Sequence, residues 1–228
     1  MGTNLIADNI DNGTIKDVRD LEYEEAAVKN MLTGGTFVIL AGLIGGIFGW
    51  LLGVFASRII GPSGYAIFTI TNSFVLVISS ISGGLNQSIS KYVAEGLVSS
   101  KEQAILYSKS GTLSTTIFGI LLFSIFLVIS FISYLYGQIL YMYIYLFIAI
   151  ALLFAYLRDN IYGNLAGFKK FNPIAIINLI SIIISVGFGF ITLLYIPEPF
   201  KDILYASQVF IFVVVQYLLS IFYGKRFL

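Results

Sequence analysis

Five long stretches of this chain carry no charged residue, and this pattern constrains the fold more than any motif does. An α-helix needs about 20 apolar residues to cross a lipid bilayer. The uncharged stretches are residues 30–57, 59–90, 110–157, 171–197 and 203–224. Stretch 110–157 is more than twice as long as one crossing, so we expect it to fold back at Tyr136-Gly137-Gln138. The pattern therefore predicts six spans, near residues 32–57, 65–90, 108–133, 139–158, 172–195 and 203–223.

The composition places these helices in lipid. Hydrophobic residues make up 58% of the 228 residues and charged residues 11%, whereas soluble globular domains contain about 25% charged residues. We therefore predict an all-α integral membrane protein, a bundle of six transmembrane helices. The chain has no cysteine and no histidine, which excludes disulfides, thiol chemistry and histidine metal sites. The net charge of +1 gives no reason to expect a nucleic-acid partner.

The first 30 residues differ from the rest because they are acidic. They contain seven acidic residues against three basic ones, Lys16, Arg19 and Lys29. This start lacks the basic n-region of a secretory signal, and the apolar run that follows is too long for one. We expect residues 1–30 to form an acidic cytoplasmic tail, with at most a short helix at Leu21–Lys29, and residues 31–228 to form the transmembrane lobe.

The distribution of Lys and Arg predicts the orientation, because cytoplasmic loops of membrane proteins are enriched in these residues. If the N-terminus is cytoplasmic, eleven Lys and Arg residues lie inside and two lie outside, Arg58 and Lys201. We therefore predict a multi-pass protein of the cell membrane with both termini in the cytoplasm. Arg58 then lies at the outer end of the first helical hairpin, where Gly61, Pro62 and Gly64 favour a tight turn and the guanidinium can reach lipid headgroups.

The first predicted span has a stripe of small residues. Ala41, Gly45, Gly49, Gly53 and Ser57 follow one another at intervals of four, so they share one helix face. Small residues at this spacing let another helix backbone approach closely. The simpler interpretation is tight packing, and the functional one is a smooth face along which helices slide or tilt between two states. Both interpretations are compatible with the sequence.

Uncharged polar residues recur at helical spacing on the second, fifth and sixth predicted spans. Hydrogen bonds between helices, on the order of 1 kcal/mol each, would explain any one of these residues. Several polar faces together also predict a cavity that holds water or a ligand. The candidates for lining such a cavity are Asn72, Ser79, Asn86, Gln87, Asn178 and Ser181. The sixth span contributes Gln208, Gln216 and Ser220 to the same pattern.

Basic residues gather at the predicted cytoplasmic boundary. The segment "LRDNIYGNLAGFKKFNP" follows the fourth span, and Ser99-Ser100-Lys101-Glu102 matches a capping box that starts the helix of the third. The basic residues serve either as anchors to anionic lipid or as ligands for the phosphate of a substrate or a lipid headgroup. The candidates for phosphate or headgroup binding are Lys91, Arg158, Lys169 and Lys170.

The sequence lacks the residues that several other functions require. There is no GxxxxGK[ST] loop for ATP hydrolysis and no pair of carboxylates or histidines suited to phosphate transfer. We therefore expect no enzyme, no cofactor and no metal site. No acidic residue lies inside a predicted span, which argues against a cation-coupled antiporter. Asp159 and Glu95 lie at the inner boundary, where ion pairs with Arg158 and Lys91 would explain them.

Two segments resemble a known family. The segment "ASRIIGPSGYAIFTI", followed by "ISGGLNQSISKYVAEG", resembles the opening of the polysaccharide flippases of the multidrug/oligosaccharidyl-lipid/polysaccharide exporter superfamily. The matching positions include Arg58, Gly61, Pro62, Lys91 and Glu95. The segment from Gly163 to Phe171 is similar to the family's loop between spans four and five. These motifs are of moderate specificity, and the resemblance extends over residues 31–228.

The resemblance implies a transporter with two six-helix lobes that passes the sugar of a lipid-linked oligosaccharide through a central cavity by alternating access, while the lipid tail stays in the bilayer. It also implies a structural or gating role for Arg58, Gly61 and Pro62 at the closed outer end. The family has twelve to fourteen spans and this chain has six, so we expect a second lobe from the same gene or from another chain. Two alternatives stay open, a non-transporting membrane subunit or truncated remnant and a multidrug or cation antiporter lobe.

Overall fold

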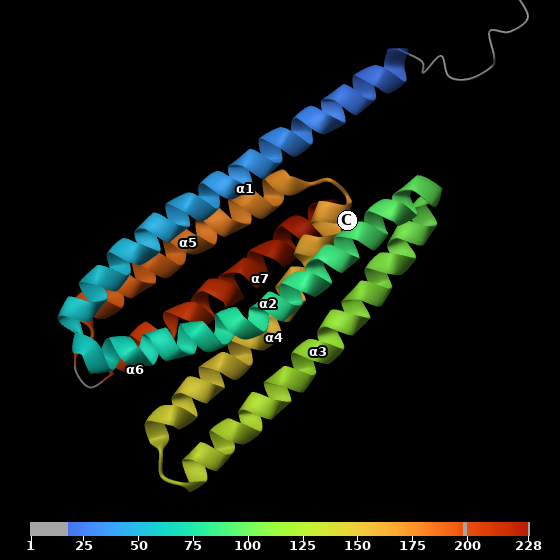
Figure 1. Cartoon of the computed structure of the whole chain (residues 1–228). Coiled ribbons are helices and arrows are strands. Elements are labelled where there is room, and N and C mark those ends of the chain that lie inside the picture. The colour runs from blue at the N-terminus through green and yellow to red at the C-terminus, as the bar shows by residue number, and fades with distance from the viewer. Residues whose placement is uncertain (1–17, 198–199, 228) are drawn as a thin grey trace, which may run out of the picture.

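The computed structural model describes residues 18–197 and 200–227, and all regular structure in these residues is helical (Figure 1). Six helices are long and apolar enough to cross a membrane, which indicates a multi-pass membrane protein. The expected all-α architecture with six long apolar helices is confirmed at this level. The helices are α1 (Val18–Ile59), α2 (Gly61–Ser99), α3 (Lys101–Leu135), α4 (Ile139–Gly167), α5 (Phe171–Tyr195), α6 (Lys201–Ala206) and α7 (Gln208–Phe227).

Large apolar side chains cover the outside of the bundle. Trp50 and Val77 are each 68% exposed, and Leu43 is 59% exposed. Exposure of this kind over whole helices is unfavourable in water and neutral in hydrocarbon. The surface therefore supports a lipid environment independently of helix length.

Helix α4 is the centre of the arrangement. It packs against α2, α3 and α7, whereas α1 contacts only α5 and α2 in the described residues. Figure 1 shows α7 running between α5 and α4, with the start of α1 and the end of α7 at the same end of the bundle. We call this the α4–α5 end, after the turn that lies there, and the opposite end the α1–α2 end.

Two of the expected turns are confirmed by the helix boundaries. Helix α3 ends at Leu135 and α4 begins at Ile139, so the long uncharged stretch does fold back at residues 136–138, where Gly137 has a φ of +70°. Between α1 and α2 the turn is tighter than expected, because only Ile60 lies outside a helix and Gly61 has a φ of +72°. Pro62 is in the first turn of α2, where its missing N–H costs no hydrogen bond.

Three boundaries differ from the sequence prediction. Helix α1 begins at Val18, so residues 18–30 are helical, whereas its apolar span begins at Leu32, as predicted. Residues 1–17 of the predicted tail lie outside the described residues. The residues between Val18 and Met31 include no Gly or Pro to end a helix. The sixth span is divided into α6 and α7 at Ser207, whose hydroxyl donates to the Leu204 carbonyl oxygen at 2.7 Å, a bond that bends helices.

The third difference concerns the segment expected to follow span four. Helix α4 continues to Gly167, nine residues beyond the predicted end at Arg158. Gly163 and Gly167 are spaced by four and face α2. A Cβ added at Gly167 would lie 2.7 Å from the Val93 Cβ, and one at Gly163 would lie 2.9 Å from the Asn86 carbonyl oxygen. The segment is therefore a helix–helix contact of small residues and not a loop.

The cap of α3 lies one residue later than expected. Ser100, not Ser99, is the N-cap, and its side chain accepts a hydrogen bond from the Gln103 backbone N–H at 3.2 Å. The Gly96 carbonyl oxygen accepts from the Ser100 N–H at 2.8 Å. One non-helical residue therefore turns the chain from α2 into α3.

Substitution of Gly167 by Ala tests the close contact between α2 and α4. We expect Gly167→Ala to lower the free energy of unfolding by about 1–3 kcal/mol because its Cβ overlaps Val93. Gly84→Ala is the control, since nothing lies within 4 Å of a Cβ there, and alanine in an open helical site stabilises by up to about 1 kcal/mol. The measurement is denaturant unfolding of both variants in detergent. Equal effects would contradict the close contact.

Candidate functional site

A cavity of about 560 Å³ lies between α1, α2, α5 and α7. We call it the central cavity. Its size lies within the range of about 300–1,000 Å³ that is typical of small-molecule sites. The residues that line it are Gly42, Gly45, Gly49, Tyr65, Phe68, Asn72, Asn178, Ile182, Ser185, Val186, Gln208 and Phe212.

Helix α1 forms one wall of the central cavity through Gly42, Gly45 and Gly49, of which the last two belong to the predicted stripe of small residues. A Cβ added at Gly45 would lie 2.5 Å from the Ile182 Cδ1 atom, so there α1 packs directly on α5. Gly42 and Gly49 have nothing within 4 Å of an added Cβ. The same face of α1 therefore packs at Gly45 and leaves space at Gly42 and Gly49, which is the physical origin of the cavity.

Neutral polar groups from three helices face this space. Asn72 comes from α2, Asn178 and Ser185 from α5, and Gln208 from α7. The Ser185 hydroxyl donates to the Gln208 backbone oxygen at 3.5 Å. The Gln208 side chain is 8% exposed, and its Oε1 atom has no hydrogen-bond partner among the described residues. No charged residue lines the cavity, so its polar chemistry is that of amides and hydroxyls.

An ion pair is buried beside the central cavity. The Arg158 guanidinium donates to the Asp159 carboxylate, with Nη2 at 2.6 Å and Nε at 2.8 Å from Oδ1. The exposed fractions of the two side chains are 14% and 6%. The other carboxylate oxygen, Oδ2, accepts from the Ser82 hydroxyl on α2. Two adjacent residues of α4 thus hold a charge pair inside the bundle, where each charge needs its partner.

Hydrogen bonds connect this ion pair to the central cavity. Arg158 Nη1 donates to Gln216 Oε1 on α7, and Gln216 Nε2 donates to Asn178 Oδ1 at 2.9 Å. The Tyr162 hydroxyl donates to the same oxygen at 2.9 Å. Arg158 also lies over the Tyr162 ring, with 5.6 Å from Cζ to the centroid, a favourable cation–π distance. We call Ser82, Asp159, Arg158, Gln216, Tyr162 and Asn178 the buried network; it joins α2, α4, α5 and α7.

A second pocket of about 400 Å³ lies at the α4–α5 end. It brings together Asn86, Gln87 and Lys91 of α2 with Lys169, which follows α4 and has a φ of +58°. Lys91 also pairs with Glu95 at 3.8 Å, in the open, and Lys170 precedes the first residue of α5. Four of the predicted site residues therefore share one pocket, which is separate from the central cavity.

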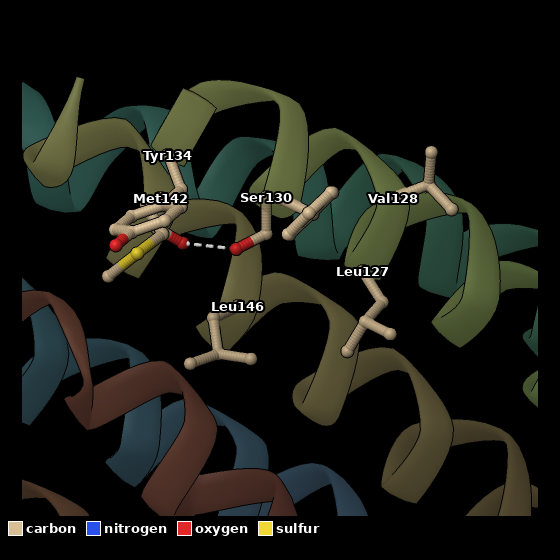
Figure 2. A pocket seen from close by; sticks show the side chains of 7 residues that line it. Leu127, Val128, Ser130, Tyr134, Met142 and Leu146 are labelled. Carbon is tan, nitrogen blue, oxygen red and sulfur yellow. Dashed lines mark hydrogen bonds between the residues drawn. The ribbon is translucent and has the colours of Figure 1, made fainter. Parts of the chain in front are cut away.

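Figure 2 shows a groove of a different kind, at the end of the α3–α4 hairpin. Leu127, Val128, Phe131 and Leu146 line it, and the Ser130 hydroxyl donates to the Met142 carbonyl oxygen at 2.8 Å. Because this bond satisfies the Ser130 hydroxyl and most of the lining is apolar, the groove offers a surface suited to a lipid chain. It contains none of the predicted site residues.

The remaining predicted residues lie apart from the central cavity. Ser181 is fully buried and donates to the Ile177 carbonyl oxygen at 2.7 Å, so its hydroxyl is satisfied within α5. Ser79 is half-buried on α2, and its carbonyl oxygen accepts from Ser82 at 2.8 Å. Arg58 is exposed in the last turn of α1, at the α1–α2 end, together with Gly61 and Pro62. Of the six predicted cavity residues, Asn72 and Asn178 line the central cavity.

The ion pair between Arg158 and Asp159 is predicted from the sequence and confirmed by the structure, but its burial and its bonds to Ser82 and Gln216 are not predicted. Asp159 is 4% exposed and lies within α4, eight residues before its end. The sequence does contain one signal for this burial, the pair Gly163-x-x-x-Gly167. Small residues at this spacing are typical of packed helices, so they indicate that the helix continues beyond Arg158. The partners Ser82 and Tyr162 carry no comparable signal, because only the relative rotation of α2 and α4 places them beside the ion pair.

Comparison of the chain with protein-family models, with curated proteins and with solved structures finds no match.

The buried ion pair predicts a large asymmetry between single and double substitutions. We expect Asp159→Asn to lower the free energy of unfolding by about 3–5 kcal/mol, because it leaves the Arg158 charge without a counter-ion. Arg158→Met combined with Asp159→Leu should recover part of this loss, since no buried charge remains. Glu95→Gln, in the exposed pair with Lys91, should cost only about 0–1 kcal/mol. Denaturant unfolding in detergent measures all three, and equal losses for Asp159→Asn and Glu95→Gln would contradict the burial of the pair.

Proposed function

We propose that this chain is one lobe of a flippase that moves a lipid-linked oligosaccharide or polysaccharide precursor across the cell membrane by alternating access. The observation that carries the proposal is the central cavity, a space between α1, α2, α5 and α7 where amides and hydroxyls gather on a largely apolar lining. Polar groups in such a position are costly unless they have a partner. A hydrophilic ligand that enters the bundle supplies one.

The chemistry of the central cavity suits a sugar. Amide and hydroxyl groups both donate and accept hydrogen bonds, as sugar hydroxyls do. The rings of Tyr65, Phe68 and Phe212 offer apolar surface to the C–H faces of a sugar. The resemblance of residues 56–70 and 81–96 to polysaccharide flippases points to the same substrate class. The pocket that contains Lys91 and Lys169 is suited to the phosphate of the lipid carrier at the membrane surface.

A drug or cation antiporter lobe is a second candidate because Asp159 is buried. Buried acidic residues in membrane helices mark ion pathways, and the sequence analysis had placed no acidic residue inside a span. The Asp159 carboxylate is, however, bound by Arg158 and Ser82, which leaves it no open position for a cation. This arrangement favours the flippase. A subunit that does not transport is the third candidate, and for it the polar faces serve packing alone.

A flippase of this type needs a second lobe to close the transport path. We propose that the second lobe is another six-helix bundle, from the same gene or another chain, and that it approaches the glycine side of α1. The α1 surface beside the central cavity is suited to such contact because small residues permit close helix approach.

Disruption of the gene in its source cell tests the transport proposal. We expect lipid-linked oligosaccharide to accumulate on the cytoplasmic leaflet and surface polysaccharide to fall, and the intact gene to restore both. Asn72→Leu should fail to restore them because it removes an amide and fills the central cavity. Val77→Leu, on the lipid-facing side of α2 (68% exposed), is the matched control and should restore them. The readouts are surface polysaccharide and carrier-linked sugar in each leaflet. Normal surface polysaccharide after disruption would contradict the proposal.

We further propose that both termini are cytoplasmic, so that the α4–α5 end faces the cytoplasm. Reporters fused after Phe227 and inserted after Lys169 should be active only as cytoplasmic fusions, and one inserted after Gly137 only as an external fusion. The measurement is the activity of a reporter pair with opposite compartment requirements. External activity after Phe227 would reverse the orientation and with it the assignment of the Lys91 pocket to the inner leaflet.

A further inference from the structure

The hydrogen bonds of the buried network run in one direction, and the arginine sets that direction. A guanidinium can only donate hydrogen bonds. The atom of Gln216 that faces Arg158 must therefore be the acceptor Oε1, which leaves the donor Nε2 to face α5. The atom of Asn178 that receives this donor must in turn be Oδ1, at 2.9 Å. The orientation of two amides thus follows from the charge of one residue.

The consequence for the central cavity lies at Asn178. Its Oδ1 accepts twice, from Gln216 Nε2 and from the Tyr162 hydroxyl at 2.9 Å. Its Nδ2 carries two N–H donors and forms no hydrogen bond with any described residue, while the side chain lines the cavity. An amide that could otherwise present either end to a ligand is therefore held with its donor end free.

The ion pair is oriented in the same direction as the hydrogen bonds that run from Arg158 to Asn178. Asp159 is bound to Ser82 on α2, whereas Arg158 reaches toward Gln216 on α7 and Tyr162. The positive end of the pair therefore lies on the Asn178 side. Polarisation along a chain of hydrogen bonds strengthens the terminal donor, which here is Asn178 Nδ2.

We propose that Asn178 determines the ligand preference of the central cavity, and that Arg158 is its positioning residue, acting through Gln216. The amide N–H groups of Asn178 bind an anionic oxygen, which accepts hydrogen bonds and cannot donate them. Such an oxygen comes from the carboxylate of an acidic sugar or from a phosphate. This inference rests on the proposed function, because it assumes that a sugar-bearing ligand enters the central cavity.

Three disaccharides that differ only at C6′ test the proposal: cellobiose, with a hydroxymethyl group, cellobiouronic acid, with a carboxylate, and cellobiose 6′-phosphate. The full chain is embedded in lipid nanodiscs free of sugar detergents, and binding is measured by ligand-observed NMR titration. We expect at least one anionic probe to bind about tenfold more tightly than cellobiose, as charge-assisted hydrogen bonds are the stronger ones. Tighter binding of cellobiouronic acid would identify a carboxylate as the source of the oxygen, and tighter binding of cellobiose 6′-phosphate would identify a phosphate.

Substitutions separate the direct role from the positioning role. Asn178→Asp keeps the acceptor for Gln216 and Tyr162 but replaces the donor by an oxygen, so the preference should disappear or reverse. Gln216→Glu can still accept from Arg158 but cannot donate to Asn178, which frees that amide to flip. We expect it to reduce the anionic preference and to leave the affinity for cellobiose within about twofold. Ser181→Ala is the control on α5, since Ser181 is buried outside the cavity, and should keep the preference.

The outcomes distinguish this inference from the proposed function. Binding of all three probes with equal affinity, or an unchanged preference in Asn178→Asp, overturns the inference and leaves the flippase proposal standing. An unchanged preference in Gln216→Glu removes the positioning role. No binding of any probe at millimolar concentration overturns the inference and counts against a sugar ligand as well. Unfolding temperatures of the variants show whether a loss of preference reflects a loss of fold.

Discussion

The low dielectric constant inside a helical membrane bundle is the constraint on which the rest of this structure depends. A charge there needs a counter-charge and hydrogen bonds, or the free energy of its burial exceeds what packing provides. Arg158 and Asp159 meet this requirement with each other, and Ser82 and Gln216 add one hydrogen bond each to the carboxylate and the guanidinium. Ser82 lies on α2, the ion pair on α4 and Gln216 on α7. The requirement for pairing therefore also fixes how α2, α4 and α7 are rotated relative to one another, which apolar contacts alone would specify only weakly.

Glycine has two opposite effects in this bundle. At Gly163 and Gly167 the absence of a side chain lets α4 touch α2, and the contact is filled. At Gly42 and Gly49 the same absence leaves space, because α5 and α2 do not approach α1 closely enough to fill it. Gly45 and Gly49 are spaced by four, as Gly163 and Gly167 are, yet Gly45 makes a contact and Gly49 leaves space. Whether a glycine makes a contact or leaves space is decided by how closely the facing helix approaches, and Val93 opposite Gly167 and Ile182 opposite Gly45 are examples of contacts.

The features that depend on one helix at a time could be predicted from the sequence. Helix number and the turn at Gly137 follow from length and composition, because a bilayer crossing demands a fixed apolar length. The amides of Asn72 and Asn178 were identified as cavity candidates from their polarity and spacing. The end of α4 at Gly167 was not predicted, because two adjacent charged residues, Arg158 and Asp159, are typical of a membrane boundary. Gln208 and Gln216 were recognised as a polar face, but their roles differ: one lines the central cavity and the other lies behind it. That difference depends on the break at Ser207 and on the rotation of α7, neither of which follows from periodicity.

The central cavity has one side that resists movement and one that does not. Helices α2, α5 and α7 are joined through the buried network, so displacing any of them breaks hydrogen bonds of that network. Residues 32–59 of α1 form no hydrogen bond with another described helix, and they pack through contacts such as Gly45 with Ile182 and Gly53 with Tyr65. Contacts of this kind are lost in small increments, because each atom pair contributes only about 0.1–0.2 kcal/mol. We therefore expect a change in the volume of the central cavity to be accommodated by movement of α1, with Asn178 held in place by its bonds to Gln216 and Tyr162.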